Sequence, residues 1–358
     1  METLKKIPMK IIIAIDSFKG CLSSMEANAA AAEGVKDACK DADIRQVAVS
    51  DGGEGFLSAY HAAIGGEFVE LPVMNPLMHP VRAKYLLKDH LAVIEMAEAS
   101  GLTLIANHER NPLITTTYGT GQLIADAVRQ GAERIIVGLG GSATSDAGQG
   151  MLQALIDTFS KNGAWENMQE LKRVHFTIAS DVSNPLCGEQ GAARVFAPQK
   201  GATPEMVEQL EHRAKQFAAA SARLLGYDRS EVPGAGAAGG LGYALMQYLD
   251  ADSQSGIDLL LEAMDFKKLT SDADLVVTGE GRADTQTLMG KLPIGILRHS
   301  GQVPVCLIAG QVSDPQSLLQ AGFSHVECIN PPELPIKSAL HPEVAHQNIR
   351  RTVSRILK

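Results

Sequence analysis

Two short stretches decide the fold, and they lie near opposite ends of the chain: KIIIAIDSFKG at residues 10–20 and LVVTGEGRAD at residues 275–284. Each begins with a short apolar run that passes directly into a polar loop containing glycine. A short apolar run bounded by turn residues predicts a buried strand. Helical patterns follow both loops, so each stretch predicts a strand, loop and helix of a mainly parallel sheet.

The same alternation continues next to both stretches. A helix is predicted over residues 23–40, with Ser23 as its cap and Glu26 at the capping-box position. A strand over residues 44–49 ends in the acidic turn SDGGEG, and residues 294–298 and 303–308 predict a further helix and strand. These segments predict one Rossmann-like, doubly wound sheet built from both ends of the chain.

The middle of the chain has a different pattern. Residues 68–73 and 82–87 alternate like strands, and two proline-containing breaks separate them. Short strands are also predicted over residues 134–137, 177–179 and 192–196, and a long amphipathic helix over residues 204–225. We therefore predict a discontinuous Rossmann-like domain, residues 1–78 plus 286–358, and an inserted second α/β domain, residues 79–285, with the active-site cleft between them.

Composition and charge exclude several classes of function. The chain has 358 residues, and its 32 Lys and Arg against 41 Asp and Glu give a net charge of −9. Without a basic field to release counterions, no binding to nucleic acid or to an acidic membrane is expected. Five widely spaced cysteines predict a reducing compartment rather than disulfides or structural zinc. The charged start and the short apolar run behind it predict a cytoplasmic protein with no signal peptide or spanning helix.

Glycine gathers in short loops, and this placement predicts phosphate binding. The loop GLGGSATSD, residues 138–146, follows a predicted strand and precedes a helix, where backbone N–H groups and the helix dipole favour an anion. A second loop, GAGAAG at residues 234–239, matches a dinucleotide-binding pattern but follows Val232-Pro233 instead of a strand. Tight turns in an alanine- and glycine-rich protein are the alternative explanation. The predicted nucleotide-binding residues are Gly138, Gly140, Gly141, Ser142, Thr144, Gly236 and Gly239.

Charged residues follow the ends of the predicted strands. Because the carboxyl ends of parallel strands converge on one crevice, basic side chains would lie there beside several carboxylates. Magnesium-dependent phosphoryl transfer needs this combination: carboxylates for the metal ion, a base for the alcohol, and Lys or Arg for the transferred charge. Helix caps and solvated turns are the alternative explanation. The predicted catalytic residues are Asp16, Lys19, Asp181, Arg282 and Lys291, and the predicted metal ligands are Asp51, Glu54, Glu280 and Asp284.

Taken together, these loops resemble the type I glycerate kinase family. The resemblance rests on DSFKG (16–20), DGGEG (51–55), TTTYGTG (115–121), GGSAT (140–144), PQKG (198–201), GAGAAGGLG (234–242) and TGEGR (278–282) with Asp284 and Gly290-Lys291. It covers nearly the whole chain, from about residue 10 to residue 330. The chain departs from the family pattern at Ile15, Ser50, Ser145 and Ala147, and over residues 158–173, where it is shorter and lacks a GGG segment.

The resemblance implies a two-domain α/β enzyme that phosphorylates D-glycerate with ATP and Mg²⁺, with 2-phosphoglycerate favoured over 3-phosphoglycerate. On this hypothesis Arg282 binds the glycerate carboxylate through two parallel hydrogen bonds, and Asp181 or Asp16 faces the hydroxyl. Lys19 and Lys291 neutralise the transferred phosphoryl group, while the ATP phosphates lie on a glycine loop. A homodimer is expected because twofold dimers are the commonest oligomers.

Other hypotheses stay open from the sequence. A nicotinamide-dependent dehydrogenase would use the GxGxxA pattern that begins at Gly138, but no acidic residue follows at the distance a ribose contact needs. A metabolite sensor that lost turnover, or a kinase of another small hydroxy acid, fits the shortened segment of residues 158–173. The presence of the charged residues Asp16, Lys19, Asp51, Glu280, Arg282 and Lys291 argues against such a loss.

Overall fold

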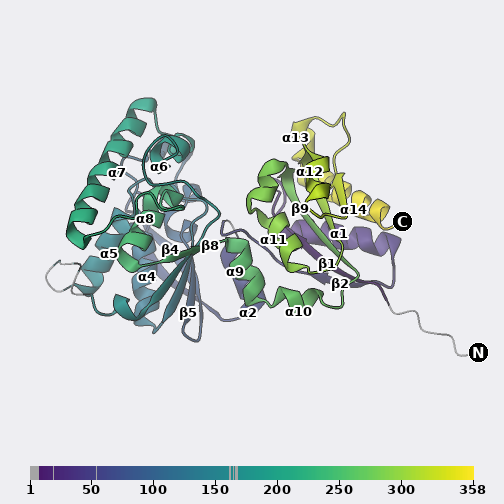
Figure 1. Ribbon diagram of the computed structural model, residues 1–358, viewed down its shortest axis with the longest axis horizontal. Coiled ribbons are helices and arrows are strands. Elements are labelled where there is room, and N and C mark those ends of the chain that lie inside the picture. Colours follow the sequence, from purple (N-terminus) through teal and green to yellow (C-terminus); the bar gives the residue numbers. More distant parts are fainter. Residues whose placement is uncertain (1–7, 19, 54, 161–162, 164, 166–167) are drawn as a thin grey trace, which may run out of the picture. The chain divides into compact units, whose positions relative to one another are not determined.

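Figure 1 shows the computed structural model of the chain, which describes residues 8–18, 20–53, 55–160, 163, 165 and 168–358. The chain forms two compact units: unit 1 comprises Met1–Asp51 and Ile257–Lys358, and unit 2 comprises Gly52–Gly256. Each unit packs helices against its own sheet, which confirms the α/β class predicted from the sequence.

The boundaries of the units lie upstream of the predicted boundaries after residues 78 and 285. Strand β3 (Glu67–Met74) pairs along its whole length with β4 (Pro80–Lys88), so the residues before β4 belong with the middle of the chain. Strand β9 (Leu275–Ala283) pairs with β1 (Lys10–Ile15), so the residues around β9 belong with the ends of the chain. An active-site cleft between two domains stays a prediction.

Unit 1 is built on a five-stranded parallel sheet with the order β11-β10-β9-β1-β2. The remaining strands are β2 (Asp43–Gln46), β10 (Val305–Val312) and β11 (His325–Cys328). The helices are α1 (Ser24–Ala38), α9 (Gly256–Ala263), α10 (Phe266–Thr270), η6 (Thr285–Met289), α11 (Leu292–His299), α12 (Pro315–Gln320), α13 (Ile336–Ala339) and α14 (Pro342–Ile356). From β1 the chain steps to β2 on one side, whereas β9, β10 and β11 follow on the other side. The strand order therefore reverses between β1 and β9.

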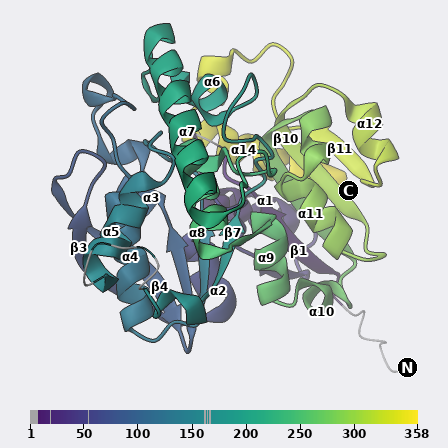
Figure 2. The ribbon, with the colours of Figure 1, turned by 60° about the vertical axis from the view of Figure 1, so that its left-hand side comes forward.

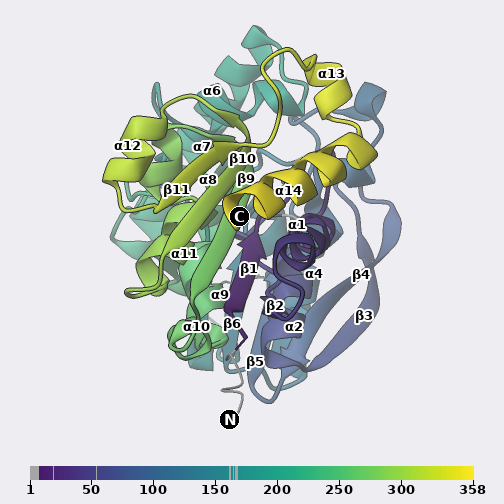
Figure 3. The same cartoon turned by 90° about the vertical axis from the view of Figure 1, so that its right-hand side faces the viewer.

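Strand β1 is the centre of unit 1 because both of its faces are buried. Ile11, Ile13 and Ile15 pack against α1 and α14, which lie beside each other in Figure 3. Ile12 and Ala14 on the opposite face are equally inaccessible to solvent. Strands of doubly wound sheets carry helices on both faces and therefore have continuous apolar sequences, as KIIIAI does.

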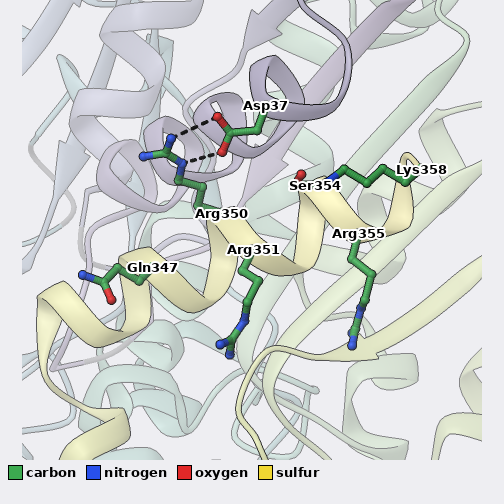
Figure 4. A pocket seen from close by; sticks show the side chains of 7 residues that line it. All are labelled: Asp37, Gln347, Arg350, Arg351, Ser354, Arg355 and Lys358. Carbon is green, nitrogen blue, oxygen red and sulfur yellow. Dashed lines mark hydrogen bonds and ion pairs between the residues drawn. The ribbon is translucent and has the colours of Figure 1, made fainter.

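Helices α1 and α14 approach each other closely at Gly34. A Cβ atom on Gly34 would lie 2.3 Å from the carbonyl oxygen of Arg350 on α14. The guanidinium of Arg350 donates to both carboxylate oxygens of Asp37 on α1, at 2.6 and 3.0 Å, as Figure 4 shows. The glycine therefore sets how closely the two helices pack, and the ion pair lies at the surface of the same contact.

Unit 2 contains a six-stranded sheet with the order β3-β4-β5-β6-β7-β8, in which the pairs from β3 to β5 are antiparallel and the others parallel. Its other strands are β5 (Leu91–Glu95), β6 (Arg134–Gly138), β7 (His175–Ala179) and β8 (Asp252–Gln254). Its helices are α2 (Phe56–Ile64), α3 (Ala97–Ser100), η1 (Leu102–Leu104), η2 (Asn107–Glu109), α4 (Tyr118–Arg129), α5 (Gln149–Phe159), η4 (Leu171–Arg173), α6 (Ala192–Phe196), η5 (Pro198–Lys200), α7 (Pro204–Leu225) and α8 (Ala237–Leu249). The long helix α7 has the predicted bounds and packs with α6 and α8 (Figure 2).

One strand prediction is wrong in unit 2. Residues 192–196 form helix α6 instead of a strand, because Ala193 packs with Val207 and Leu210 of α7. A short apolar run does not by itself distinguish a buried strand from a buried helical turn. Strand β8 is not predicted from the sequence. Its three residues, DSQ, are polar and exposed and therefore give no hydrophobic signal.

Replacing Gly34 with alanine tests the contact between α1 and α14. Alanine favours a helix over glycine by about 1 kcal/mol. The added methyl group, however, would overlap the carbonyl oxygen of Arg350, which the backbone of α14 holds in place. We expect a net loss of about 1–3 kcal/mol in the free energy of unfolding, measured by urea denaturation. Ala29→Ser, at an exposed site of the same helix, is the matched control and should stay within about 0.5 kcal/mol of wild type. A Gly34→Ala protein as stable as this control would contradict the close approach.

Candidate active site

A pocket of about 620 Å³ lies at the carboxyl ends of β1 and β9, where the strand order of unit 1 reverses. Its polar lining includes five of the predicted residues, Asp16, Asp51, Glu280, Arg282 and Lys291. Another part of its lining is apolar and consists of Pro331, Pro332, Leu334, Ile336 and Leu340. Ligands of open parallel sheets bind at such a reversal point. The structure thus gathers charged residues from three separate segments of the chain at the expected place.

Asp16 is held at the strand end by backbone hydrogen bonds. Its N–H donates to the carbonyl of Gly279 at 2.9 Å, which extends the contact between β1 and β9 by one residue. One carboxylate oxygen of Asp16 accepts a hydrogen bond from the N–H of Ser17 at 2.7 Å. The half-buried carboxylate therefore has a defined orientation beside the pocket.

Glu280 is more buried than Asp16 or Asp51, with 6% of its surface exposed. It accepts a 2.6 Å hydrogen bond from Thr287 Oγ1, and Lys291 Nζ lies 3.7 Å from its other oxygen. Burial raises the pKa of Glu280, while Thr287 and Lys291 oppose that rise because they stabilise the carboxylate. Glu280 therefore positions the ammonium group of Lys291 at the pocket.

Arg282 is oriented by a second acidic residue. Its side chain is 63% exposed, and its Nε lies 3.1 Å from Asp284 Oδ2. Asp284 is itself fixed, because it caps η6 by accepting from the N–H of Gln286 at 2.9 Å. The contact that orients Arg282 is made by Nε, so a fork formed by its terminal nitrogens could take a carboxylate.

Two of the predicted metal ligands, Glu280 and Asp284, are thus each engaged with a basic side chain. The described part of the chain has no group of three carboxylate, histidine or cysteine side chains that could hold a metal ion. Mg²⁺ usually needs only one or two protein carboxylates when substrate phosphates and water complete its shell. Asp51, which lines the pocket together with Asp16, fits that smaller contribution. The fourth predicted ligand, Glu54, lies outside the described residues.

The glycine loop of residues 138–146 lies in unit 2, directly after β6. The N–H groups of Gly140 and Ala143 donate to the carbonyls of Gly52 and Ser100, at 3.1 and 2.9 Å, and are not available to a ligand. Within the described residues no such partner is found for the N–H groups of Gly141, Ser142, Thr144 and Ser145. The distal half of the loop therefore offers the backbone donors that a phosphate needs.

Hydroxyl groups in the same half of the loop also lack partners. Thr144 Oγ1 and Ser145 Oγ are buried, and neither is hydrogen-bonded within the described ranges. The carboxylate of the neighbouring Asp146 is already hydrogen-bonded within the protein. It accepts from the N–H groups of Thr117, Gly148 and Gly150 at 2.8, 3.1 and 3.1 Å. Leaving a buried polar group unpaired costs about 1–3 kcal/mol.

The second glycine loop, residues 234–242, packs closely against the first one. Gly239 has a φ of 67°, and a Cβ atom on it would lie 2.1 Å from the carbonyl oxygen of Thr144. The carbonyl of Gly239 accepts a hydrogen bond from the N–H of Ala147 at 3.0 Å. The left-handed conformation continues at Gly240, so α8 begins with a kink. Close packing, the alternative that the sequence left open, explains these glycines.

Close packing also explains three other glycines among the predicted nucleotide-binding residues. A Cβ atom on Gly138 would lie 2.9 Å from the ring of Phe56, and one on Gly140 would lie 2.3 Å from Gly53 Cα. A Cβ atom on Gly236 would lie 2.3 Å from the carbonyl oxygen of Pro185. Direct contact of these residues with a nucleotide stays a prediction.

The remaining catalytic residues predicted from the sequence are placed as follows. Asp181 lies in unit 2, in the loop after β7, and its side chain is exposed. Lys19 lies outside the described residues. Asp181 and the glycine loop therefore belong to unit 2, whereas the lining of the pocket belongs to unit 1.

Sequence analysis assigned no role to Lys200, a buried basic residue at the end of η5. It is 2% exposed, and its Nζ donates to Ser142 Oγ at 2.7 Å and to the carbonyl oxygen of Thr144 at 2.5 Å. Burial lowers the pKa of Lys200 to about 7, and the negative charge of Asp146 partly opposes this effect. The motif PQKG contains this residue, but a lysine in a polar stretch gives no sequence signal of burial.

A different pocket, of about 560 Å³, lies on α14 and is mainly basic. Its lining residues, drawn in Figure 4, are Asp37, Gln347, Arg350, Arg351, Ser354, Arg355 and Lys358. None of the predicted site residues is among them. Arg350 is paired with Asp37, and Arg355 donates to Glu327 at 2.8 Å. Because the predicted residues line the pocket at β1 and β9 instead, that pocket is the candidate active site.

Comparison with known proteins shows the family of the chain. The crystal structure of a glycerate kinase 2 from Salmonella typhimurium LT2 matches the chain with a TM-score of 0.79 and 38% sequence identity, over 98% of each chain. Glycerate kinase of Bacillus subtilis (strain 168) is 46% identical over an alignment of 367 positions, which covers 96% of each chain. Glycerate 2-kinase of Escherichia coli (strain K12) is 40% identical over 328 residues, which cover 86% of each chain.

These relatives define the chain as an α/β enzyme of the kinase class. The model of the glycerate kinase family matches residues 11–358, and the chain therefore belongs to the glycerate kinase family. This confirms the family that the loops predicted from sequence, and the dehydrogenase hypothesis is discarded.

The buried lysine predicts a stability that depends on pH. Folded Lys200 loses its proton near pH 7, whereas the ordinary pKa of a lysine is 10.5. Between these values the unfolded chain binds more protons than the folded chain, so the free energy of unfolding rises with pH by about 1 kcal/mol per pH unit. Below pH 7 both states are protonated, and the gain is absent.

We expect this rise in urea denaturation of wild type between pH 7 and 9, and a smaller rise in Lys200→Met. Lys172→Met, which removes an exposed lysine of the same unit, should follow wild type. If Lys200→Met and wild type gained stability equally with pH, Lys200 would not titrate in this range.

Proposed function

We propose that this protein transfers the γ-phosphoryl group of ATP to D-glycerate and forms 2-phosphoglycerate in preference to 3-phosphoglycerate. The observation that carries the proposal is the pocket of unit 1, in which two basic side chains lie beside three carboxylates at the reversal point of the sheet. Support for the substrate comes from relatives named glycerate kinase, one of them glycerate 2-kinase, that cover most of the chain.

Phosphoryl transfer requires mainly positioning and charge stabilisation. In the proposed reaction a hydroxyl oxygen of glycerate forms the new P–O bond while the bond from the γ-phosphorus to the ADP oxygen breaks. The hydroxyl proton passes to a carboxylate, for which Asp16 is the first candidate and Asp181 the second. Lys291, positioned by Glu280, balances the charge of the transferred group.

Arg282 is the proposed partner of the glycerate carboxylate. Asp284 holds it through Nε, so the remaining two nitrogens of the guanidinium present a planar fork. Bidentate pairing with a carboxylate fixes both the position and the direction of a small substrate. Lys19 keeps its predicted role as a second cation for the phosphoryl group.

The ATP phosphates are proposed to bind the distal half of the glycine loop, residues 141–145. Unpaired N–H groups in this segment supply donors for phosphate oxygens. Mg²⁺ bound with the phosphates would neutralise charge on the transferred group. Asp51, with Glu54, is the proposed protein contribution to its ligands, while Glu280 and Asp284 act by positioning the two basic side chains.

We also propose that the enzyme works in the cytoplasm as a homodimer. All five cysteines lie in the described part of the chain and are free, which fits a reducing compartment. Among the described residues no helix is long and apolar enough to cross a membrane. Light scattering on the purified protein measures the oligomeric state directly.

A coupled assay with ATP, magnesium and D-glycerate, followed by phosphorus NMR of the product, tests the proposal. Glycerate-dependent ADP release with a signal for the 2-phosphate supports it, and a signal for the 3-phosphate alone overturns the preferred product. Binding of both substrates without turnover would favour the sensor hypothesis. Turnover with another hydroxy acid but not with D-glycerate would change the substrate.

Arg282→Lys tests the proposed carboxylate contact. Lysine keeps the charge but loses the planar fork, so we expect the KM for D-glycerate to rise about tenfold while the KM for ATP changes less than about twofold. Arg355→Lys, at a surface ion pair of the same unit, is the control and should match wild type. An unchanged KM for D-glycerate in Arg282→Lys would remove Arg282 from the substrate site.

A further inference from the structure

Lys200 is a buried basic side chain that lies outside the pocket of unit 1. The proposed reaction gives it no role. Its neighbour Gly201 has a φ of 94°, and a Cβ atom there would lie 2.7 Å from the carbonyl oxygen of Arg110. This left-handed residue ends η5 and fixes the backbone behind the lysine. The side chain is therefore directed into unit 2, toward Ser142 and Thr144, by backbone packing.

The number of hydrogen-bond partners matches an uncharged amine. Among the described residues Lys200 Nζ has two acceptors, Ser142 Oγ and the carbonyl oxygen of Thr144. A neutral amine has two N–H groups, whereas an ammonium has three and would leave one unpaired in a buried place. The lowered pKa of Lys200 agrees with this geometry. The charge of Asp146 acts on Lys200, and Arg110 lies next to Gly201.

The loop that Lys200 contacts is anchored on its other side as well. The N–H of Ala143 donates to the carbonyl of Ser100, and the N–H of Leu102 donates to the carbonyl of Gly141 at 2.8 Å. Lys200 adds a third anchor next to the N–H groups of residues 141, 142, 144 and 145, which have no backbone partner within the described residues. A hydroxyl that accepts from Lys200 must also point its own hydrogen elsewhere, so the lysine sets the direction in which Ser142 donates.

We propose that Lys200 is a positioning residue of the kinase reaction, which orients Ser142 and the backbone of residues 141–145 for the phosphates of ATP. This inference rests on the proposed function, because it takes residues 141–145 as the phosphate-binding segment. Lys200 does not touch the substrate: it acts through Ser142 and through the Thr144 carbonyl.

Steady-state kinetics of Lys200→Met test this role. Methionine keeps the length and apolar body of the side chain but cannot donate, so Ser142 loses its orientation. We expect the KM for ATP to rise about tenfold, with the KM for D-glycerate within about twofold of wild type. Lys172→Met is the matched control and should leave both constants unchanged. Equal KM values for ATP in Lys200→Met and wild type would overturn the proposal.

A double-mutant cycle separates positioning from a general loss of stability. If Lys200 acts through Ser142, Lys200→Met and Ser142→Ala overlap, and the double variant raises the KM for ATP no more than the larger single effect. Additive effects, or parallel changes in both KM values, indicate a structural role only and contradict the proposal. Should Lys200→Met not fold, Ser142→Ala alone must still raise the KM for ATP selectively.

The same experiments distinguish this inference from the proposed function. Calorimetric titration of wild type with ATP and magnesium comes first. No binding and no turnover in wild type would contradict the proposed function itself. Normal binding and turnover in wild type, with unchanged kinetics in Lys200→Met, would contradict only the role of Lys200.

Discussion

The parallel pairing of β1 with β9 is the constraint on which the rest of the structure depends. It joins residues 264 positions apart, such as Ala14 and Thr278, whose hydroxyl donates to the Ala14 carbonyl at 2.7 Å. The entropy cost of closing so long a segment grows only slowly with its length, and burial of both faces of β1 offsets it. Because the two strands run in the same direction, Asp16 and Glu280 reach the same edge of the sheet. Unit 2 is inserted between the strands without disturbing this pairing.

The pocket at that edge uses its acidic residues in two ways. Glu280 and Asp284 are fixed by Thr287 and by the N–H of Gln286, and each holds one basic side chain. Pairing lowers the freedom of Lys291 and Arg282, so less entropy is lost when a charged substrate binds. In the proposed reaction, Asp16 and Asp51 are the acidic groups for the hydroxyl and for the metal ion. This proposed division of roles would supply the positioning that phosphoryl transfer requires.

Much of unit 1 could be predicted because its signals are local. The apolar run of β1 and the polar loop after it fixed both the strand bounds and the place of Asp16. Prediction failed where the decisive contact is made by residues distant in sequence. Residues 192–196 form a helix because α7 covers them, and the glycines at 236 and 239 are required by neighbouring carbonyls rather than by a visible turn pattern. The burial of Lys200 depends on residues distant in sequence, such as Ser142 and Thr144. A single lysine in a polar motif gives no sign of it.

The central claim is that phosphoryl transfer takes place at the reversal point between β1 and β9, and Asp16→Asn tests it most directly. Asparagine keeps the oxygen that accepts from Ser17 but removes the proton acceptor. We predict that kcat with ATP and D-glycerate falls by about 10²- to 10⁴-fold, while the urea midpoint stays at the wild-type value. Asp41→Asn, an exposed residue of the same unit, is the control. A kcat within about twofold of wild type in Asp16→Asn would contradict the account.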